Sequence, residues 1–128
     1  MPARTSATLT EAELRLMEVL WAKGPCTVQQ VVDALPADTP LAYNSVLTTI
    51  RILEKKGYLE HDKDGRAHVY RPVVARQEAA RSEIRNLVRR MFGNSHELLV
   101  LNVIQEEQID LAELNHLREM LKQKEERS

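Results

Sequence analysis

Small hydrogen-bonding side chains and basic side chains share one predicted helix, residues 42–56. Asparagine can pair with adenine, a hydroxyl can meet several base edges, and arginine or lysine can neutralise a phosphate. The candidates for base contact are Tyr43, Asn44, Ser45, Leu47 and Thr48. The candidates for phosphate contact are Thr27, Arg51, Lys55, Lys63 and Arg66. This set favours binding to double-stranded DNA over the making or breaking of bonds.

Each of these residues also has a plainer interpretation. The three polar residues Asn44, Ser45 and Thr48 can be ordinary exposed side chains, and a single basic residue can simply be a solubilising charge. Leu47 either touches a thymine methyl group or is half-buried between helices. Thr27 precedes the second predicted helix, where it either contacts a phosphate or only caps that helix.

Patterns of catalysis and metal binding do not appear in the sequence. It has no nucleophile elbow with a Ser/His/Asp set, no phosphate-cradling glycine loop and no helix with paired metal ligands. The four histidines are scattered, at His61, His68, His96 and His116. The single cysteine, Cys26, cannot form an internal disulfide and is expected to be a small buried apolar residue. We therefore expect no enzyme activity, no metal and no cofactor.

Length and charge fit a small binding protein. The 128 residues allow one globular domain, or a small domain with an added assembly element. The net charge is −1, but residues 51–90 hold 11 basic and 6 acidic residues, whereas residues 95–128 hold 4 basic and 8 acidic ones. A local basic region is sufficient for contact with nucleic acid, although most charge runs are solvated helix faces.

Membrane segments are not expected. The longest apolar runs, such as residues 98–101, are interrupted after a few positions. Residues 1–7 contain no apolar stretch of the signal-peptide type. The sequence therefore predicts a cytoplasmic protein with no direct membrane insertion.

Three helices are predicted in the first part of the chain. Two capping-box patterns, one beginning at Thr10 and one at Thr27, each precede apolar residues at helical spacing. Gly24-Pro25, Pro36 and Gly57 supply the stops. The expected helices span residues 11–23, 28–35 and 42–56.

The period of apolar residues then falls from 3.6 to 2. Residues 58–61 and 67–71 fit two strands around a polar tip, 62–66, which contains the turn signal Asp-Gly. This order is that of a winged helix-turn-helix domain, in which the third helix can lie in the major groove. We assign the domain to residues 1–75, in a mainly α fold with a small β-ribbon. Its core is expected to contain Trp21, Val31, Val46, Ile50 and Val69.

Leucine-rich helices are predicted beyond residue 75. They are expected over 76–92, around 98–104 and from 110 onwards, in a helical region assigned to residues 76–128. So short a bundle leaves apolar surface in water, and pairing with a second copy is the natural remedy. The alternative is a tail that folds back on the first part as one monomeric core. The expected dimer contacts are Leu87, Leu98, Leu101, Ile104, Leu114, Leu117 and Leu121.

Three stretches carry a family resemblance: LTEAELRLMEVLWAKGPCTVQQVVDAL, LAYNSVLTTIRILEKKGYLEHDKDGRAHVYRPVV and NSHELLVLNVIQEEQIDLAELNHLREML. They resemble the penicillinase-repressor family of bacterial transcription factors, the BlaI/MecI/CopY type, from about Leu9 to Leu121. The most specific features are Trp21 with Gly24-Pro25, the 46–57 stretch, and Gly65-Arg66-Ala67 followed by Tyr70 and Pro72.

The resemblance implies a homodimeric repressor that binds an inverted-repeat operator through its winged domains. It also implies pairing through the C-terminal helices. The family's usual partner is a membrane-bound sensor metalloprotease whose activation leads to cleavage of the repressor in its C-terminal region, which frees the promoter.

Two departures from the family pattern bear on regulation. The family is commonly cut at Asn-Phe, and the aligned pair here is Asn102-Val103, so the candidate cleavage site lacks the aromatic residue. The copper-responsive branch has paired C-terminal cysteines, which residues 95–128 lack. The sequence therefore argues against copper sensing by that route and weakens the case for cleavage at this bond.

A sequence-specific, DNA-binding repressor is the function we expect. Winged helices also serve as protein-docking modules, and a fold does not fix a function. The alternative is therefore a docking scaffold that uses the third helix or the leucine-rich tail to bind another protein.

Overall fold

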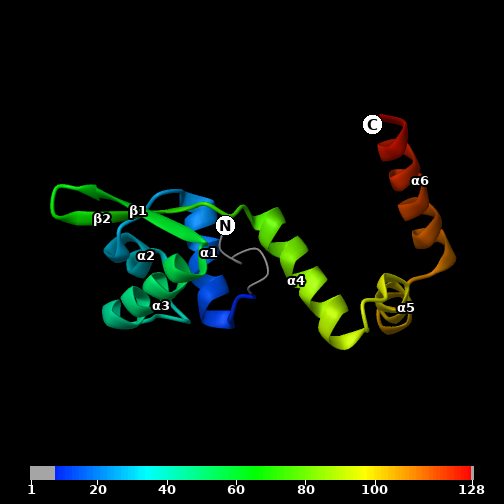
Figure 1. The fold of residues 1–128 in the computed structure, drawn as a ribbon, viewed down its shortest axis with the longest axis horizontal. Coiled ribbons are helices and arrows are strands. Elements are labelled where there is room, and N and C mark those ends of the chain that lie inside the picture. Colours follow the sequence, from blue (N-terminus) through cyan, green and yellow to red (C-terminus); the bar gives the residue numbers. More distant parts are fainter. Residues whose placement is uncertain (1–7, 128) are drawn as a thin grey trace. The chain divides into compact units, whose positions relative to one another are not determined.

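The computed structural model describes residues 8–127. Over these residues the elements follow the predicted order of helices around a ribbon, which confirms a mainly α fold with a winged helix-turn-helix arrangement (Figure 1). The elements are α1 (Glu11–Lys23), α2 (Val28–Ala34), α3 (Tyr43–Lys56), β1 (Leu59–Asp64), β2 (Ala67–Pro72), α4 (Arg76–Met91), α5 (His96–Glu106) and α6 (Leu111–Arg127).

The sequence predicts a chain without membrane-spanning segments. Within residues 8–127, no helix is both long and apolar enough to cross a bilayer. The expectation that the N-terminus lacks an export signal concerns residues 1–7, which lie outside the described part of the chain.

Helix starts follow the capping chemistry of the sequence. The Thr10 hydroxyl accepts the N–H of Glu13 while the Glu13 carboxylate accepts the N–H of Thr10, and Thr27 and Gln30 repeat this reciprocal pair at α2. At the other end of α3, Gly57 adopts a φ of 90°, a left-handed conformation that closes the helix. The three predicted helices therefore begin and end within one residue of their expected positions.

The tip of the ribbon is shorter than predicted. β1 continues to Asp64 and pairs with β2 in an antiparallel register that sets Asp64 opposite Ala67. Only Gly65 and Arg66 remain for the turn, and Gly65 supplies the positive φ, 64°, that a tight hairpin turn needs at its first position. The predicted five-residue tip, 62–66, was wrong because strand pairing continues through its polar residues. The ribbon projects beyond the helices α1 to α3 (Figure 1).

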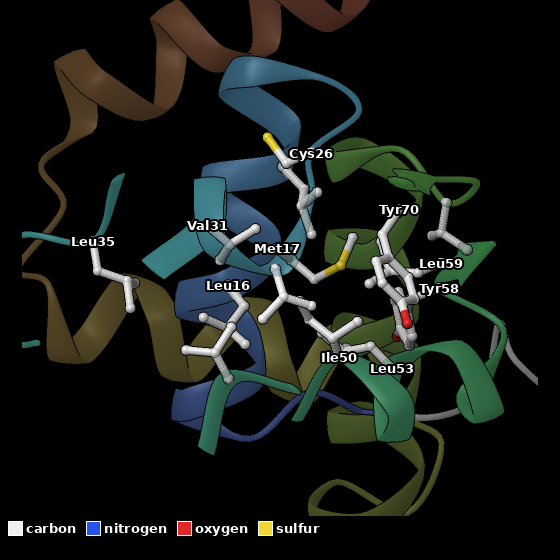
Figure 2. Close-up of a cluster of buried hydrophobic side chains, with 14 of the residues drawn as sticks. Leu16, Met17, Cys26, Val31, Leu35, Ile50, Leu53, Tyr58, Leu59 and Tyr70 are labelled. Carbon is white, nitrogen blue, oxygen red and sulfur yellow. The ribbon is translucent and has the colours of Figure 1, made fainter. Parts of the chain in front are cut away.

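The core lies between α1, α2, α3 and the base of the ribbon. Figure 2 shows side chains of the three helices gathered with Tyr58, Leu59 and Tyr70. Val31, Val46 and Ile50 are fully buried, as predicted, and Cys26 is buried as a small apolar residue.

Two predicted core residues lie at the margin instead. Val69 is only half-buried, because side chains alternate along β2 and the inward position belongs to Tyr70, which is 2% exposed. Trp21 is also half-buried: its Nε1–H donates to the carbonyl oxygen of Val74 at 2.9 Å, and the Arg76 guanidinium lies 4.9 Å from its ring centre. The indole packs against the core with its polar edge at the rim.

The chain forms two compact units, one ending at Asn86 and the other beginning at Leu87. The first turns of α4 belong to the first unit, where Ala79 joins the core and the Glu83 carboxylate accepts the N–H of Leu9 at 2.9 Å. The predicted boundary after residue 75 lies earlier along the chain.

The second unit has little interior of its own. Over residues 87–127 only Val88 is buried, and α5 and α6 bury no residue. Their starts are still well formed, since Ser95 accepts the N–H of Leu98 and Asp110 accepts the N–H of Glu113. These helices are therefore defined locally, without a core beneath them.

A partly buried ion pair joins α1 to the end of α3. The Lys56 Nζ donates to Glu13 Oε1 at 2.7 Å and to the carbonyl oxygen of Thr8 at 3.0 Å. Burial by itself raises the pKa of Glu13, but the hydrogen bonds from Lys56 and Thr10 and the positive charge of Lys56 outweigh it, so the pKa is lowered.

Lys56→Met is expected to lower the free energy of unfolding at pH 7 by about 1 to 3 kcal/mol, because the buried Glu13 carboxylate loses its charged partner. The expected loss is smaller than for a fully buried pair because 29% of the Lys56 side chain is exposed. Urea denaturation measures the change, and Lys55→Met, which removes the same charge one residue away, serves as the control.

The loss should depend on pH. Because the folded-state pKa of Glu13 is lowered, its ionised form adds stability above its ordinary value of 4.5, and this stability disappears as the pH falls through the folded-state pKa. The difference between wild type and Lys56→Met should therefore shrink as the pH falls below 4.5 and through the lowered folded-state pKa. Equal losses for Lys55→Met and Lys56→Met would contradict this role.

Candidate nucleic-acid interface

The rotation of α3 is set by its buried face. Val46, Ile50 and Leu53 are fully buried in the core. Helical geometry then turns the opposite side of α3 to solvent. Its exposed side chains are Tyr43, Asn44, Ser45, Thr48, Arg51, Ile52 and Lys55, and we call this set the outer face of α3.

Hydroxyl groups on α3 bond back to its own backbone. The Thr48 hydroxyl donates to the carbonyl oxygen of Asn44 at 2.9 Å, and Thr49 donates to that of Ser45 at 2.9 Å. A threonine bonded in this way offers an outside partner its oxygen as an acceptor and its methyl group as an apolar contact. In this arrangement Thr48 is an acceptor toward solvent.

A hollow of about 410 Å³ lies between α3, the start of α2 and the ribbon. It brings together five of the predicted contact residues from three separate stretches of sequence: Thr27, Tyr43, Leu47, Arg51 and Arg66. Its other lining residues are Val28, Gln29, Ala67, His68 and Tyr70. We call it the α3–ribbon hollow.

Five predicted contact residues do not line the α3–ribbon hollow. Asn44, Ser45, Thr48 and Lys55 are exposed on the outer face of α3, and Lys63 is exposed on β1. Leu47 fits both of its interpretations, since it is half-buried against the core and also lines the hollow.

The two faces of the ribbon carry side chains of different chemistry. The register sets His61 opposite Tyr70 and Lys63 opposite His68, so these four share one face. The rings of His61 and His68 stack with centroids 4.5 Å apart, and the His61 Nδ1 lies 2.5 Å from Glu54 Oε2 at the end of α3. This face contributes His68 and Tyr70 to the hollow.

The other face of the ribbon is acidic with one neutralised arginine. Arg71 donates to Glu60 at 2.9 Å and to Asp62 at 3.1 Å, and the hydrogen bond with Asp62 is the main cause that raises the Arg71 pKa. Among the described residues, Lys63 and Arg66 form no such ion pair. Within the ribbon, the positive charges available to an outside anion therefore lie at Lys63 and Arg66.

A backbone bridge holds the ribbon to the helical body. The N–H of Cys26 donates to the carbonyl oxygen of Tyr70 at 2.9 Å, and the N–H of Tyr70 donates to that of Cys26 at 2.8 Å. Burial raises the pKa of the Cys26 thiol and also that of the Tyr70 hydroxyl, so both stay neutral at pH 7. Cys26 takes part in this bridge through its backbone, and its thiol is buried in the core.

Sequence reasoning missed three residues at this surface. Gln29 and His68 line the α3–ribbon hollow. Ile52 is 42% exposed on the outer face of α3, four residues after Thr48. The spacing from Thr48 could have indicated Ile52, because residues four apart share a helix face.

The predicted dimer contacts lie on exposed or half-buried apolar surface of the tail. Leu87, Leu98, Leu101, Leu117 and Leu121 are exposed, whereas Ile104 and Leu114 are half-buried. The candidate cleavage pair, Asn102 and Val103, lies inside α5, where the Asn102 amide donates to the carbonyl oxygen of Leu98 at 2.8 Å.

Comparison with known proteins places this arrangement in a family. The family model described as penicillinase repressor matches residues 9–123. The chain belongs to the penicillinase repressor family. The match covers α1 to α5 and most of α6, so it includes both the outer face of α3 and the apolar tail.

Individual relatives agree with this membership. A penicillinase repressor from Bacillus licheniformis is 26% identical over 115 residues, which cover 90% of each chain. The transcriptional regulator BlaI of Mycobacterium tuberculosis is 42% identical over 71 residues, 55% of this chain and 51% of the other. The solution structure of the DNA-binding domain of the repressor BlaI superposes with a TM-score of 0.52 and 28% identity, over 61% of this chain and 93% of that domain. These family members are named as repressors and DNA-binding regulators, not as enzymes.

Proposed function

We propose that this protein is a sequence-specific DNA-binding transcriptional repressor that acts in the cytoplasm as a homodimer on an inverted-repeat operator. The observation that carries the proposal is the convergence of Thr27, Arg51 and Arg66 from three elements beside the outer face of α3. Membership of a family whose relatives are named as repressors supports it. No catalytic step is part of this role.

The outer face of α3 would meet base edges in the major groove. Asn44, Ser45 and Thr48 are exposed near the start of α3, the part of a recognition helix that commonly contacts bases. Asparagine can bond to adenine in two places, and the outward Thr48 oxygen suits the amino groups of adenine or cytosine. Tyr43 and Leu47 would pack against the groove wall at the edge of the hollow.

The basic residues around α3 would hold the DNA backbone. Arg51 on α3 and Arg66 at the ribbon turn both line the hollow, and Lys55 and Lys63 add positive charge on α3 and β1. The Thr27 hydroxyl accepts the N–H of Gln30 and retains its own hydrogen for a phosphate oxygen. Such contacts position the protein without identifying bases.

The tail would pair two copies. Ten large apolar side chains of residues 87–127 are exposed: Leu87, Met91, Leu98, Val100, Leu101, Val103, Leu111, Leu117, Met120 and Leu121. Covering them with the same helices of a second copy would supply the interior that this unit lacks.

Release of the operator by cleavage in the tail is a further part of the proposal, with a membrane-bound sensor metalloprotease as the expected partner. A protease binds an extended chain, so a cut at Asn102–Val103 would require α5 to unwind locally. Val103 in place of an aromatic residue argues that any such cut falls at another bond of the tail.

The first test is selection of DNA by the purified full chain from a pool of random duplexes. We expect one inverted-repeat sequence to be enriched and to bind about 10³-fold or more tightly than random duplex at physiological salt. Equal affinity for both would contradict the repressor function. In that case the docking alternative predicts partner binding that changes little with salt.

Two arginines of the ribbon offer a matched comparison. Arg66→Ala should weaken binding to all duplexes alike and reduce the slope of log affinity against log salt by about one unit, because one phosphate contact is lost. Arg71→Ala removes the same charge, but Arg71 is bound to Glu60 and Asp62, so DNA binding should change little. Fluorescence anisotropy at several salt concentrations measures both, and identical behaviour would refute the phosphate role of Arg66.

The oligomeric state tests the role of the tail. Leu101→Glu should shift the full chain from dimer toward monomer in sedimentation equilibrium, because it places a charge in an apolar contact. Ile52→Glu changes a similarly exposed apolar residue on α3 and should leave the dimer intact. A wild-type chain that is monomeric at micromolar concentration would show that the tail has another function.

A further inference from the structure

Exposed apolar side chains of the first unit concentrate on α3. Among the described residues up to Asn86, three large apolar side chains are exposed: Tyr43, Ile52 and Ile84. Two of these three lie on the outer face of α3, beside residues that the proposed function places at DNA. The remainder of this unit covers its apolar residues well, so the exposure at α3 calls for a physical reason.

Thr48 extends this apolar character along α3. Its hydroxyl donates to the Asn44 carbonyl oxygen, which leaves its methyl group as its apolar contact surface. Ile52 follows one turn later, and residues four apart lie next to each other on a helix. The two side chains therefore form a short apolar strip, which we call the Thr48–Ile52 strip.

Arg51 lies along the other edge of the outer face. Arg51 lines the α3–ribbon hollow together with Tyr43 and Leu47, whereas neither Thr48 nor Ile52 does. The outer face of α3 thus has one edge that meets phosphates and one that is apolar. In a major groove, an apolar group at a base edge has one partner of matching chemistry, the C5 methyl group of thymine.

We infer that the Thr48–Ile52 strip recognises thymine methyl groups in the operator, with Ile52 as a specificity-determining residue. This inference rests on the proposed function. The two residues lie about 6 Å apart along the helix, and base pairs follow one another every ~3.4 Å, so the strip covers about two base steps. Each half of the operator is therefore expected to contain a thymine whose methyl group contacts Ile52.

The test removes that methyl group from the DNA. Starting from the duplex that the wild-type chain enriches, each thymine of one half-site is replaced in turn by deoxyuridine, which lacks only the C5 methyl group. We expect one replacement to weaken wild-type binding by about fourfold, the value of one buried methyl group. In Ile52→Ala the same replacement should leave the binding affinity unchanged.

Ile84→Ala is the matched control, because Ile84 is a similarly exposed isoleucine on α4. It should retain the fourfold preference for thymine over deoxyuridine. The ratio of the two affinities is the readout, so a general change in binding by either variant cancels.

The possible outcomes distinguish failure of this inference from failure of the proposed repressor function. If no sequence is enriched, the repressor function fails and the inference fails with it. If a sequence is enriched but every deoxyuridine duplex binds as tightly as its thymine counterpart, the repressor function stands and methyl recognition by the Thr48–Ile52 strip is overturned. A methyl preference that persists in Ile52→Ala also overturns it, and would indicate that the exposed isoleucine serves a different partner.

Discussion

Burial of Val46, Ile50 and Leu53 decides which side of α3 faces solvent. Each such side chain contributes roughly 1.5–3 kcal/mol when fully buried, and a small domain is stable by only about 5–15 kcal/mol in total. Turning α3 by one residue would rotate it by about 100° and expose this set, so no alternative rotation competes. The positions of Asn44, Thr48, Arg51 and Ile52 relative to the rest of the first unit follow from that core.

The ribbon adds a second constraint through its period of two. Pairing of Tyr70 with Cys26 fixes which face of β2 turns inward, and the register then assigns His61, Lys63 and His68 to the same side as Tyr70. A shift by one residue would exchange the faces and bring the acidic side to the hollow. Arg71 holds Glu60 and Asp62 on the far face, so the strand register also determines how the charges of the ribbon are divided between its two faces.

Helix boundaries could be predicted from the sequence, whereas contacts between residues far apart in the chain were harder to predict. The capping boxes at Thr10 and Thr27 and the stop at Gly57 act within a few residues, so the helices could be predicted closely. The choice between Val69 and Tyr70 as the inward residue depends on the bridge to Cys26, more than forty positions away. The α3–ribbon hollow likewise exists only once α2, α3 and the turn are folded together, and its members Gln29 and His68 carried no sequence signal. Ile52 looked ordinary because exposure is a property of the fold.

Dimerisation through an exposed apolar tail would give the repressor a way to be switched without changing its DNA-binding unit. One winged domain makes a limited number of phosphate contacts, and its affinity falls steeply as salt rises. When two such domains are joined, binding of the first raises the effective concentration of the second at its half-site, which can add a factor of about 10² to 10⁴. Loss of the tail contact would remove that factor while leaving the core, α3 and the ribbon intact. The sparse interior of α5 and α6 is consistent with this division, because an assembly element that must come apart is better stabilised by its partner than by itself.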